Sequence, residues 1–190
     1  MKTQTIAIIA VIATLTIISC GGSGGGASSV PTEYLHDAAG FKITAPAGWE
    51  MMDKSVETYE FRQGDYMLIE VGGFDLGKDL YETLNDPEFD YPLFLEDASL
   101  GFLKDYCKEA AITGYRVTLR NETSWGGMPA FRLKAEGFSA PINKTVTIDV
   151  LLAVNKSSCV AYVFASQIAK SKYDEASGEI ETSIASFQVI

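Results

Sequence analysis

The chain has 190 residues, of which 25 are acidic and 15 basic, so its formal net charge at neutral pH is −10. Nucleic-acid phosphates require a basic binding surface, so this composition argues against DNA or RNA as a partner. Residues 33–190 match the size of one ordinary domain, and no internal repeat divides them.

The N-terminal residues carry the pattern of a cleaved export signal. Lys2 precedes an apolar run from Ile6 to Ile18, which is shorter than the roughly 20 residues that a membrane-spanning helix needs. The four residues that end at Cys20, IISC, resemble the lipobox of bacterial lipoproteins. The resemblance implies that residues 1–19 are removed as a signal peptide, that the Cys20 thiol receives a diacylglycerol, and that the new amino terminus is acylated, for example with palmitate. An ordinary signal peptide followed by a free cysteine is the alternative.

A tether is expected between the lipid and the domain. Residues 20–32 are rich in glycine and serine and lack apolar periodicity, which is typical of a flexible coil. Removal of the signal takes away one lysine and no acid, so the mature chain stays acidic and anionic headgroups would repel it. We therefore expect Cys20 to anchor the protein to a membrane of the bacterial cell envelope, the outer membrane in a Gram-negative cell, with the domain outside the cytoplasm.

The first half of the domain predicts short strands. Residues 41–44 alternate between apolar and polar side chains and end before a proline-glycine turn. The runs 56–62 and 66–71 flank Gln63-Gly64-Asp65, which predicts a hairpin with a three-residue loop. Both faces of the run 66–71 carry apolar side chains, so we expect this strand to be covered on both sides.

Helical periodicity follows these strands. Leucines at positions 76, 80 and 84 predict a short helix that Pro87 ends. A longer helix is expected over residues 94–111. Its predicted buried stripe consists of Leu103, Cys107, Ala110 and Ala111.

The second half predicts a meander of strands and a final helix. Apolar and polar residues alternate over residues 115–120, 131–136, 146–154 and 159–166, with turn residues between these runs. Residues 172–186 carry an apolar helical stripe, and Ser171 with Asp174 resembles a capping pair. The elements together predict an α+β fold: a twisted, mostly antiparallel sheet of about seven strands packed against helices.

Three short segments resemble the PsbP-like superfamily, which takes its name from an extrinsic subunit of photosystem II. They are an opening FxIxxPxGW at residues 41–49, a WGGMPA hairpin at 125–130, and a closing helix from Tyr173 to Ser186-Phe187. The resemblance implies an α/β/α sandwich for residues 33–190 and a non-catalytic accessory, assembly or chaperone-like role. It does not identify a partner, because partners diverge within this superfamily.

Cys107 and Cys159 remain in the predicted domain. An exported protein meets oxidising conditions, so the two could form a disulfide. Free cysteine is also among the most buried residue types, so two buried thiols are the alternative.

An acidic and aromatic segment supplies the candidate ligand or partner face. This face consists of Tyr81, Asp86, Glu88, Asp90 and Tyr91. Carboxylate oxygens are ligands that calcium prefers, but the spacing of a calcium loop is missing, so a solvated loop and helix start is the alternative. We assign no metal ligand and no cofactor.

Motifs of common enzymes are missing from the sequence. It has neither a nucleophile elbow nor a phosphate-binding loop, and His36 has no histidine companion and is expected to be an exposed linker residue. The sequence therefore predicts a non-enzymatic, lipid-anchored accessory protein that docks an envelope protein or complex. The alternatives are a lipoprotein that binds a small ligand or a divalent metal, and a hydrolase whose catalytic residues meet only in the folded chain.

Overall fold

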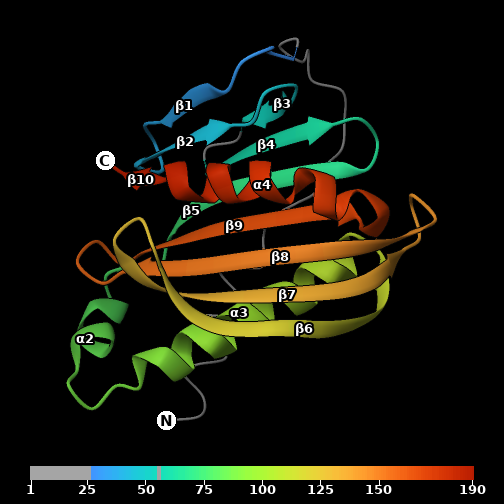
Figure 1. Cartoon of the computed structure of the whole chain (residues 1–190). Coiled ribbons are helices and arrows are strands. Elements are labelled where there is room, and N and C mark those ends of the chain that lie inside the picture. The colour runs from blue at the N-terminus through green and yellow to red at the C-terminus, as the bar shows by residue number, and fades with distance from the viewer. Residues whose placement is uncertain (1–26, 55–56) are drawn as a thin grey trace.

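The computed structural model of the chain describes residues 27–54 and 57–190 (Figure 1). The predicted signal peptide, Cys20 and residues 20–26 of the predicted tether lie outside these ranges. Within them, no helix has the length and apolar character needed to cross a membrane.

A seven-stranded antiparallel sheet forms the centre of the domain, in the order β3-β4-β5-β9-β8-β7-β6. Its strands are β3 (Glu50–Lys54), β4 (Thr58–Gln63), β5 (Met67–Asp75), β6 (Ile112–Trp125), β7 (Met128–Ser139), β8 (Lys144–Asn155) and β9 (Val160–Ala169). The predicted sheet of about seven strands is confirmed. Strands β6 to β9 are joined by successive hairpins, which confirms the predicted meander.

Turn residues fix the register of these hairpins. Gly126 and Gly127 both have positive φ, and they form the two-residue loop between the paired residues Trp125 and Met128. Such a loop matches the twist of the flanking strands and requires residues that tolerate positive φ. The loop between β4 and β5 has three residues, as predicted. It begins at Gly64, however, which is one residue later than predicted.

Helices cover both faces of the central sheet (Figure 1). Helix α3 (Tyr91–Glu109) packs on one face, and α4 (Lys170–Ser186) packs on the other, together with a three-stranded sheet of β1 (Thr32–His36), β2 (Phe41–Ala45) and β10 (Gln188–Val189). The short helix α2 (Leu80–Asn85) lies beyond the end of β5. Because two separate apolar clusters are buried in this way, β5 is covered on both faces as predicted.

The helix ends differ from the predictions. Helix α3 begins at Tyr91 rather than residue 94, because the Asp90 side chain accepts a hydrogen bond from the Leu93 N–H and caps the first turn. Ala111 lies beyond the end of this helix at φ 50° and is exposed, so its place in the buried stripe was wrong. Helix α4 begins at Lys170 with no side-chain cap, so the predicted capping pair is also wrong.

Candidate functional site

The predicted face lies around α2, at the end of the sheet where β8 turns into β9. The Leu76 N–H donates to the Cys159 carbonyl at 2.8 Å, and the Asn85 side chain donates to the Lys156 carbonyl at 3.4 Å. Leu84, on the inner side of α2, is fully buried. These contacts fix α2 against the β8–β9 turn and leave its outer side in solvent.

The structure brings four of the five predicted residues to this surface. Tyr81 is 49% exposed, and Asp86, Glu88 and Asp90 are exposed on the segment that leads into α3. Leu93 is 52% exposed in the first turn of α3, and it is absent from the predicted face because the predicted helix began after it. We call the exposed residues Tyr81, Asp86, Glu88, Asp90 and Leu93 the α2 surface.

Tyr91 does not belong to this surface, because only 7% of the residue is exposed. Its hydroxyl donates to the Val154 carbonyl at 2.7 Å, and the Lys156 amino group lies 4.0 Å from its ring centre. Burial raises the pKa of Tyr91 to about 12, so the hydroxyl stays a donor. Tyr91 therefore fixes the start of α3 against the end of β8.

Two acids of the α2 surface hold the local backbone. Asp86 Oδ1 accepts a hydrogen bond from the Glu88 N–H at 2.9 Å, and Asp90 caps α3. Across residues 27–54 and 57–190, no three histidine, cysteine, aspartate or glutamate side chains come together as a set that could hold a metal ion. The acids therefore supply negative charge and turn structure rather than a formed metal cage.

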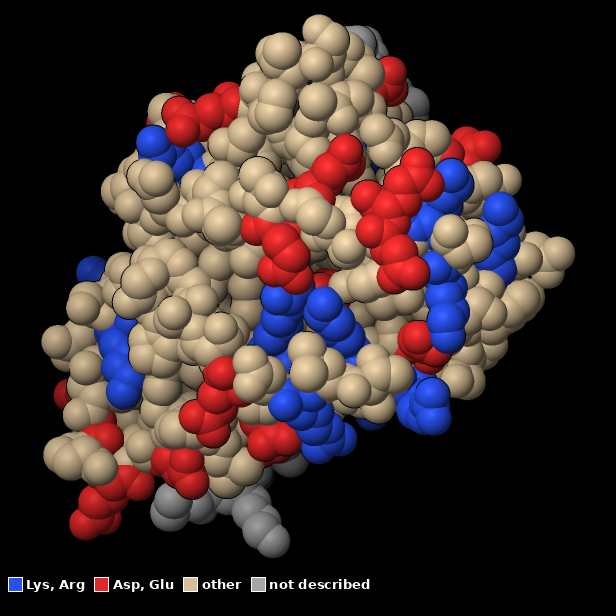
Figure 2. Space-filling view, in the orientation of Figure 1, with Lys and Arg blue, Asp and Glu red and all other residues tan. Residues whose placement is uncertain are grey.

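A pocket of about 640 Å³ adjoins Tyr81. Its lining comes from α2, the residues just before it, and the β8–β9 turn: Lys78, Asp79, Tyr81, Glu82, Ser157, Ser158 and Cys159. Figure 2 shows acidic side chains at the lower left of the molecule, where Figure 1 places α2. Strand β1, which follows the predicted tether, lies at the opposite end of the same view. The α2 surface is thus remote from the point where the tether would join the domain.

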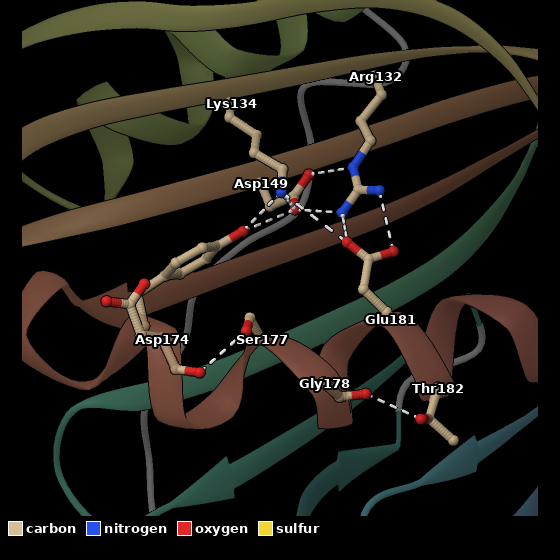
Figure 3. Close-up of polar contacts among 9 residues, drawn as sticks. Arg132, Lys134, Asp149, Asp174, Ser177, Gly178, Glu181 and Thr182 are labelled. Atoms are coloured by element: carbon tan, nitrogen blue, oxygen red, sulfur yellow. Dashed lines mark hydrogen bonds and ion pairs between the residues drawn. The ribbon is translucent and has the colours of Figure 1, made fainter.

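A second polar site, which the sequence analysis missed, lies between α4 and the central sheet (Figure 3). Arg132 on β7 donates to both carboxylate oxygens of the fully buried Asp149 on β8, at 2.9 and 2.6 Å, and to both oxygens of Glu181 on α4, at 3.1 and 2.6 Å. Lys134 donates to the Tyr173 hydroxyl at 2.8 Å and lies 3.4 Å from Asp149. We call these five residues the Arg132 network.

The charges of the Arg132 network stabilise one another. Burial alone would lower the pKa of Arg132, but hydrogen bonds to Asp149 and Glu181 raise it. The bond from Arg132 in turn lowers the pKa of Glu181. Because the guanidinium already serves two carboxylates, its role is to fix α4 on the sheet, beside a pocket of about 340 Å³ that Arg132, Glu181 and Trp125 help to line.

The sequence contains one indication of this network. On β8, Asp149 shares a face with Leu151 and Ala153. Two apolar neighbours indicate a covered face, and an acid on a covered face requires a partner. Its partners on α4 and β7 are distant in sequence, so they could not be named.

His36 was expected to be an exposed linker residue, and this expectation is wrong. Only 1% of the residue is exposed, and its ring stacks on Phe41 and meets Tyr59 edge-on. Its Nδ1 accepts a hydrogen bond from the Ala39 N–H at 3.2 Å. The imidazole therefore packs in the turn between β1 and β2 rather than facing a pocket.

Cys107 and Cys159 are free, buried thiols. The Cys159 sulfur lies 3.9 Å from the carbonyl of Lys156, whose amino group contacts the Tyr91 ring at the start of α3. Cys107 lies 16 residues beyond Tyr91 on that helix, a separation of about 24 Å along the axis. A disulfide requires Cα atoms within about 7 Å. The arrangement therefore fits the thiol alternative rather than the bond.

No protein-family model and no curated protein matches the sequence. Solved structures do resemble it. Cyanobacterial PsbP (CyanoP) of Synechocystis is 17% identical, with a TM-score of 0.61 over 92% of this chain and 99% of that one. The Ran-binding protein Mog1p of Saccharomyces cerevisiae is 13% identical, with a TM-score of 0.55 over 85% of this chain and 96% of that one. A Bacteroides thetaiotaomicron protein is also 13% identical, with a TM-score of 0.54 over 85% of this chain and 49% of that one.

The chain therefore has a PsbP-like α+β fold, which it shares with cyanobacterial PsbP and yeast Mog1p. The resemblance predicted from three short segments is confirmed at the level of the fold. At these identities the likeness concerns architecture, and function has to be argued from this chain's own surfaces.

Proposed function

We propose that this chain is an exported, lipid-anchored accessory protein without catalytic activity, and that it docks an envelope protein or complex through the α2 surface. Cys20 would hold it to the membrane, and residues 20–32 would let the domain reach its partner. One observation carries the proposal. Two exposed apolar side chains, Tyr81 and Leu93, lie together with several carboxylates at the end of the domain that is remote from β1.

The chemistry of the α2 surface suits protein binding. Tyr81 and Leu93 can each bury a large apolar area in a partner. The surrounding carboxylates would attract a basic partner and orient it during approach. A protein-binding role also has a precedent in this fold, because Mog1p is described as a Ran-binding protein.

Site-specific photocrosslinking in intact cells tests the proposal. A photoreactive amino acid at position 81 should produce a defined crosslinked protein, identified by mass spectrometry. Tyr66 offers a matched control, because it is also an exposed tyrosine but lies at the opposite end of β5, beside Lys144. Equal crosslinking from positions 81 and 66, or none from position 81, would contradict the proposed docking face.

A small-ligand carrier is the second candidate, and the pocket beside Tyr81 favours it. Its volume of about 640 Å³ lies in the range of sites for small organic molecules. Native mass spectrometry of the chain extracted in mild detergent should then reveal a bound compound. Replacement of Ser158, at the pocket wall, by Trp should displace that compound while leaving the crosslink from position 81 in place.

A further inference from the structure

Two polar side chains are buried next to each other where α3 packs on β5. Glu70 on β5 is 5% exposed, and Tyr106 on α3 is also buried. Within the described part of the chain, Glu70 Oε2 and the Tyr106 hydroxyl have no partner at full hydrogen-bond geometry, although the hydroxyl lies close enough to Glu70 to lower the pKa of its carboxyl. An unpaired buried polar group destabilises the fold, and more so if it is charged. Neither group belongs to the α2 surface or to the Arg132 network.

The charges around Glu70 disfavour a second negative charge. On β4, Glu60 lies directly opposite Glu70 in the strand register, and Arg62 donates to Glu60 Oε1 at 2.7 Å. On α3, the negative charge of Glu109 also raises the pKa of Glu70. On β9, the residue opposite Glu70 is Ala165, which supplies no charge. Among these residues the cation is Arg62, and it is already paired with the carboxylate of Glu60.

Burial, followed by repulsion from Glu60, raises the pKa of Glu70 from its ordinary value of 4.5 to about 8, while Arg62 and the Tyr106 hydroxyl oppose the shift. Glu70 therefore carries a proton at neutral pH in the folded chain. A protonated carboxyl can donate to the Tyr106 oxygen, which would satisfy both unpaired groups after a small rotation. An ionised carboxyl at this position would face Glu60 in an apolar setting.

We propose that Glu70 and Tyr106 form a proton-binding site that couples the packing of the C-terminal half of α3 on the sheet to the external pH. When this half of α3 lifts, Glu70 becomes solvated and releases one proton to water. When it packs again, Glu70 takes the proton back. A lower pH therefore stabilises the packed state of α3. This effect does not depend on whether the α2 surface binds a partner.

The size of the effect follows from proton linkage. Glu70 has its ordinary pKa when α3 is lifted and a raised pKa when α3 is packed. Between these two values each unit of pH should change the population of the lifted state by about tenfold. From pH 5.5 to pH 7.5 the lifted population should then rise by about 50-fold to 100-fold.

Hydrogen exchange of the full chain in neutral detergent measures this opening. After correction for intrinsic exchange rates, amides of residues 102–109 should lose protection between pH 5.5 and pH 7.5 in the native chain. Glu70→Gln imitates the protonated carboxyl and should remove this pH dependence. Glu60→Gln is the matched control, because it removes the facing charge but keeps the titrating group, so a reduced dependence should remain.

Equal pH dependence in the native chain and in Glu70→Gln would overturn the proposal. If Glu70→Gln does not fold, carbon-detected NMR of the native carboxyl decides the matter instead. A Glu70 titration midpoint well above the ordinary glutamate range supports the proton-binding site, and a midpoint below about 5 overturns it.

Discussion

Replacement of Arg132 by Met should destabilise the domain by leaving a buried charge without its main partner. In the native chain the guanidinium donates to both oxygens of Asp149, which is fully buried. Methionine fills much of the same volume but supplies no donor. Lys134, 3.4 Å from Asp149, would be the cation that remains.

The expected loss is about 3 kcal/mol of unfolding free energy. Removing one partner of a buried ion pair costs about 3–5 kcal/mol, and the remaining Lys134 contact places the loss near the lower end. Loss of the contact with Glu181 adds little to the destabilisation, because half of the Glu181 side chain is in solvent and can be hydrated when Arg132 is replaced. For a domain of this size the melting temperature should fall by roughly 6–12 °C, at about 2–4 °C per kcal/mol.

Urea unfolding followed by tryptophan fluorescence measures this loss at pH 7. The double variant Arg132→Met with Asp149→Leu is the matched control, because replacing both charges by apolar groups should recover most of the stability. A loss below about 1 kcal/mol for the single variant, or no recovery in the double variant, would refute the view that Asp149 depends on Arg132.

Unfolding of the same two proteins at acidic pH tests the pairing of Arg132 with Glu181. The bond from Arg132 lowers the pKa of Glu181 in the folded chain. A carboxyl with a lowered pKa contributes stability above its unfolded pKa and loses this contribution as the pH falls through its folded pKa. Native stability should therefore decline by a small amount as the pH falls below the ordinary glutamate value of 4.5, and Arg132→Met should not show this decline. Identical acid limbs in the two proteins would contradict this pairing.

Three further predictions concern the anchor, the thiols and one turn. Cys20→Ala should abolish acylation and move the protein out of the membrane fraction, as cell fractionation would show; a variant still firmly in the membrane would contradict anchoring by lipid. Cys107 and Cys159 should both react with a thiol reagent in denaturant and only slowly in the folded chain, because burial raises the pKa of each; no reaction at either position in denaturant without a reductant would point to a bond. Gly126→Ala should lower the unfolding free energy by about 2 kcal/mol more than Gly127→Ala, since both positions have positive φ but only at position 126 would a Cβ meet an aromatic ring, at 2.8 Å; chemical denaturation showing equal losses would refute the steric account.

Local patterns predicted the strands well, because each strand shows its period in a few neighbouring residues. The alternation predicted within residues 115–166 falls on β6 to β9, and the glycine pair at 126 and 127 places their first turn. Helix ends were predicted less well, since they depend on caps such as Asp90 that form only when the chain bends into place. The small sheet of β1, β2 and β10 could not be predicted as a unit, because it joins the two ends of the domain.

Part of the α2 surface was predicted for the same reason. Tyr81 and the acids near it are close together in the sequence, so their composition already indicated an aromatic and acidic face. The burial of Tyr91 was not visible, because it depends on the Val154 carbonyl at the end of β8. A residue's exposure is set by whichever distant segment folds over it.

Composition, periodicity and turn residues were therefore sufficient for the fold class and for the Cys20 lipobox as an expectation about location. Pairing between distant charges required the folded chain. Asp149 meets Arg132 because β7 and β8 run side by side, and Glu70 meets Tyr106 because α3 crosses the sheet. Secondary structure follows from short-range preferences, whereas the ionisation and partners of a buried side chain follow from the elements that surround it in three dimensions.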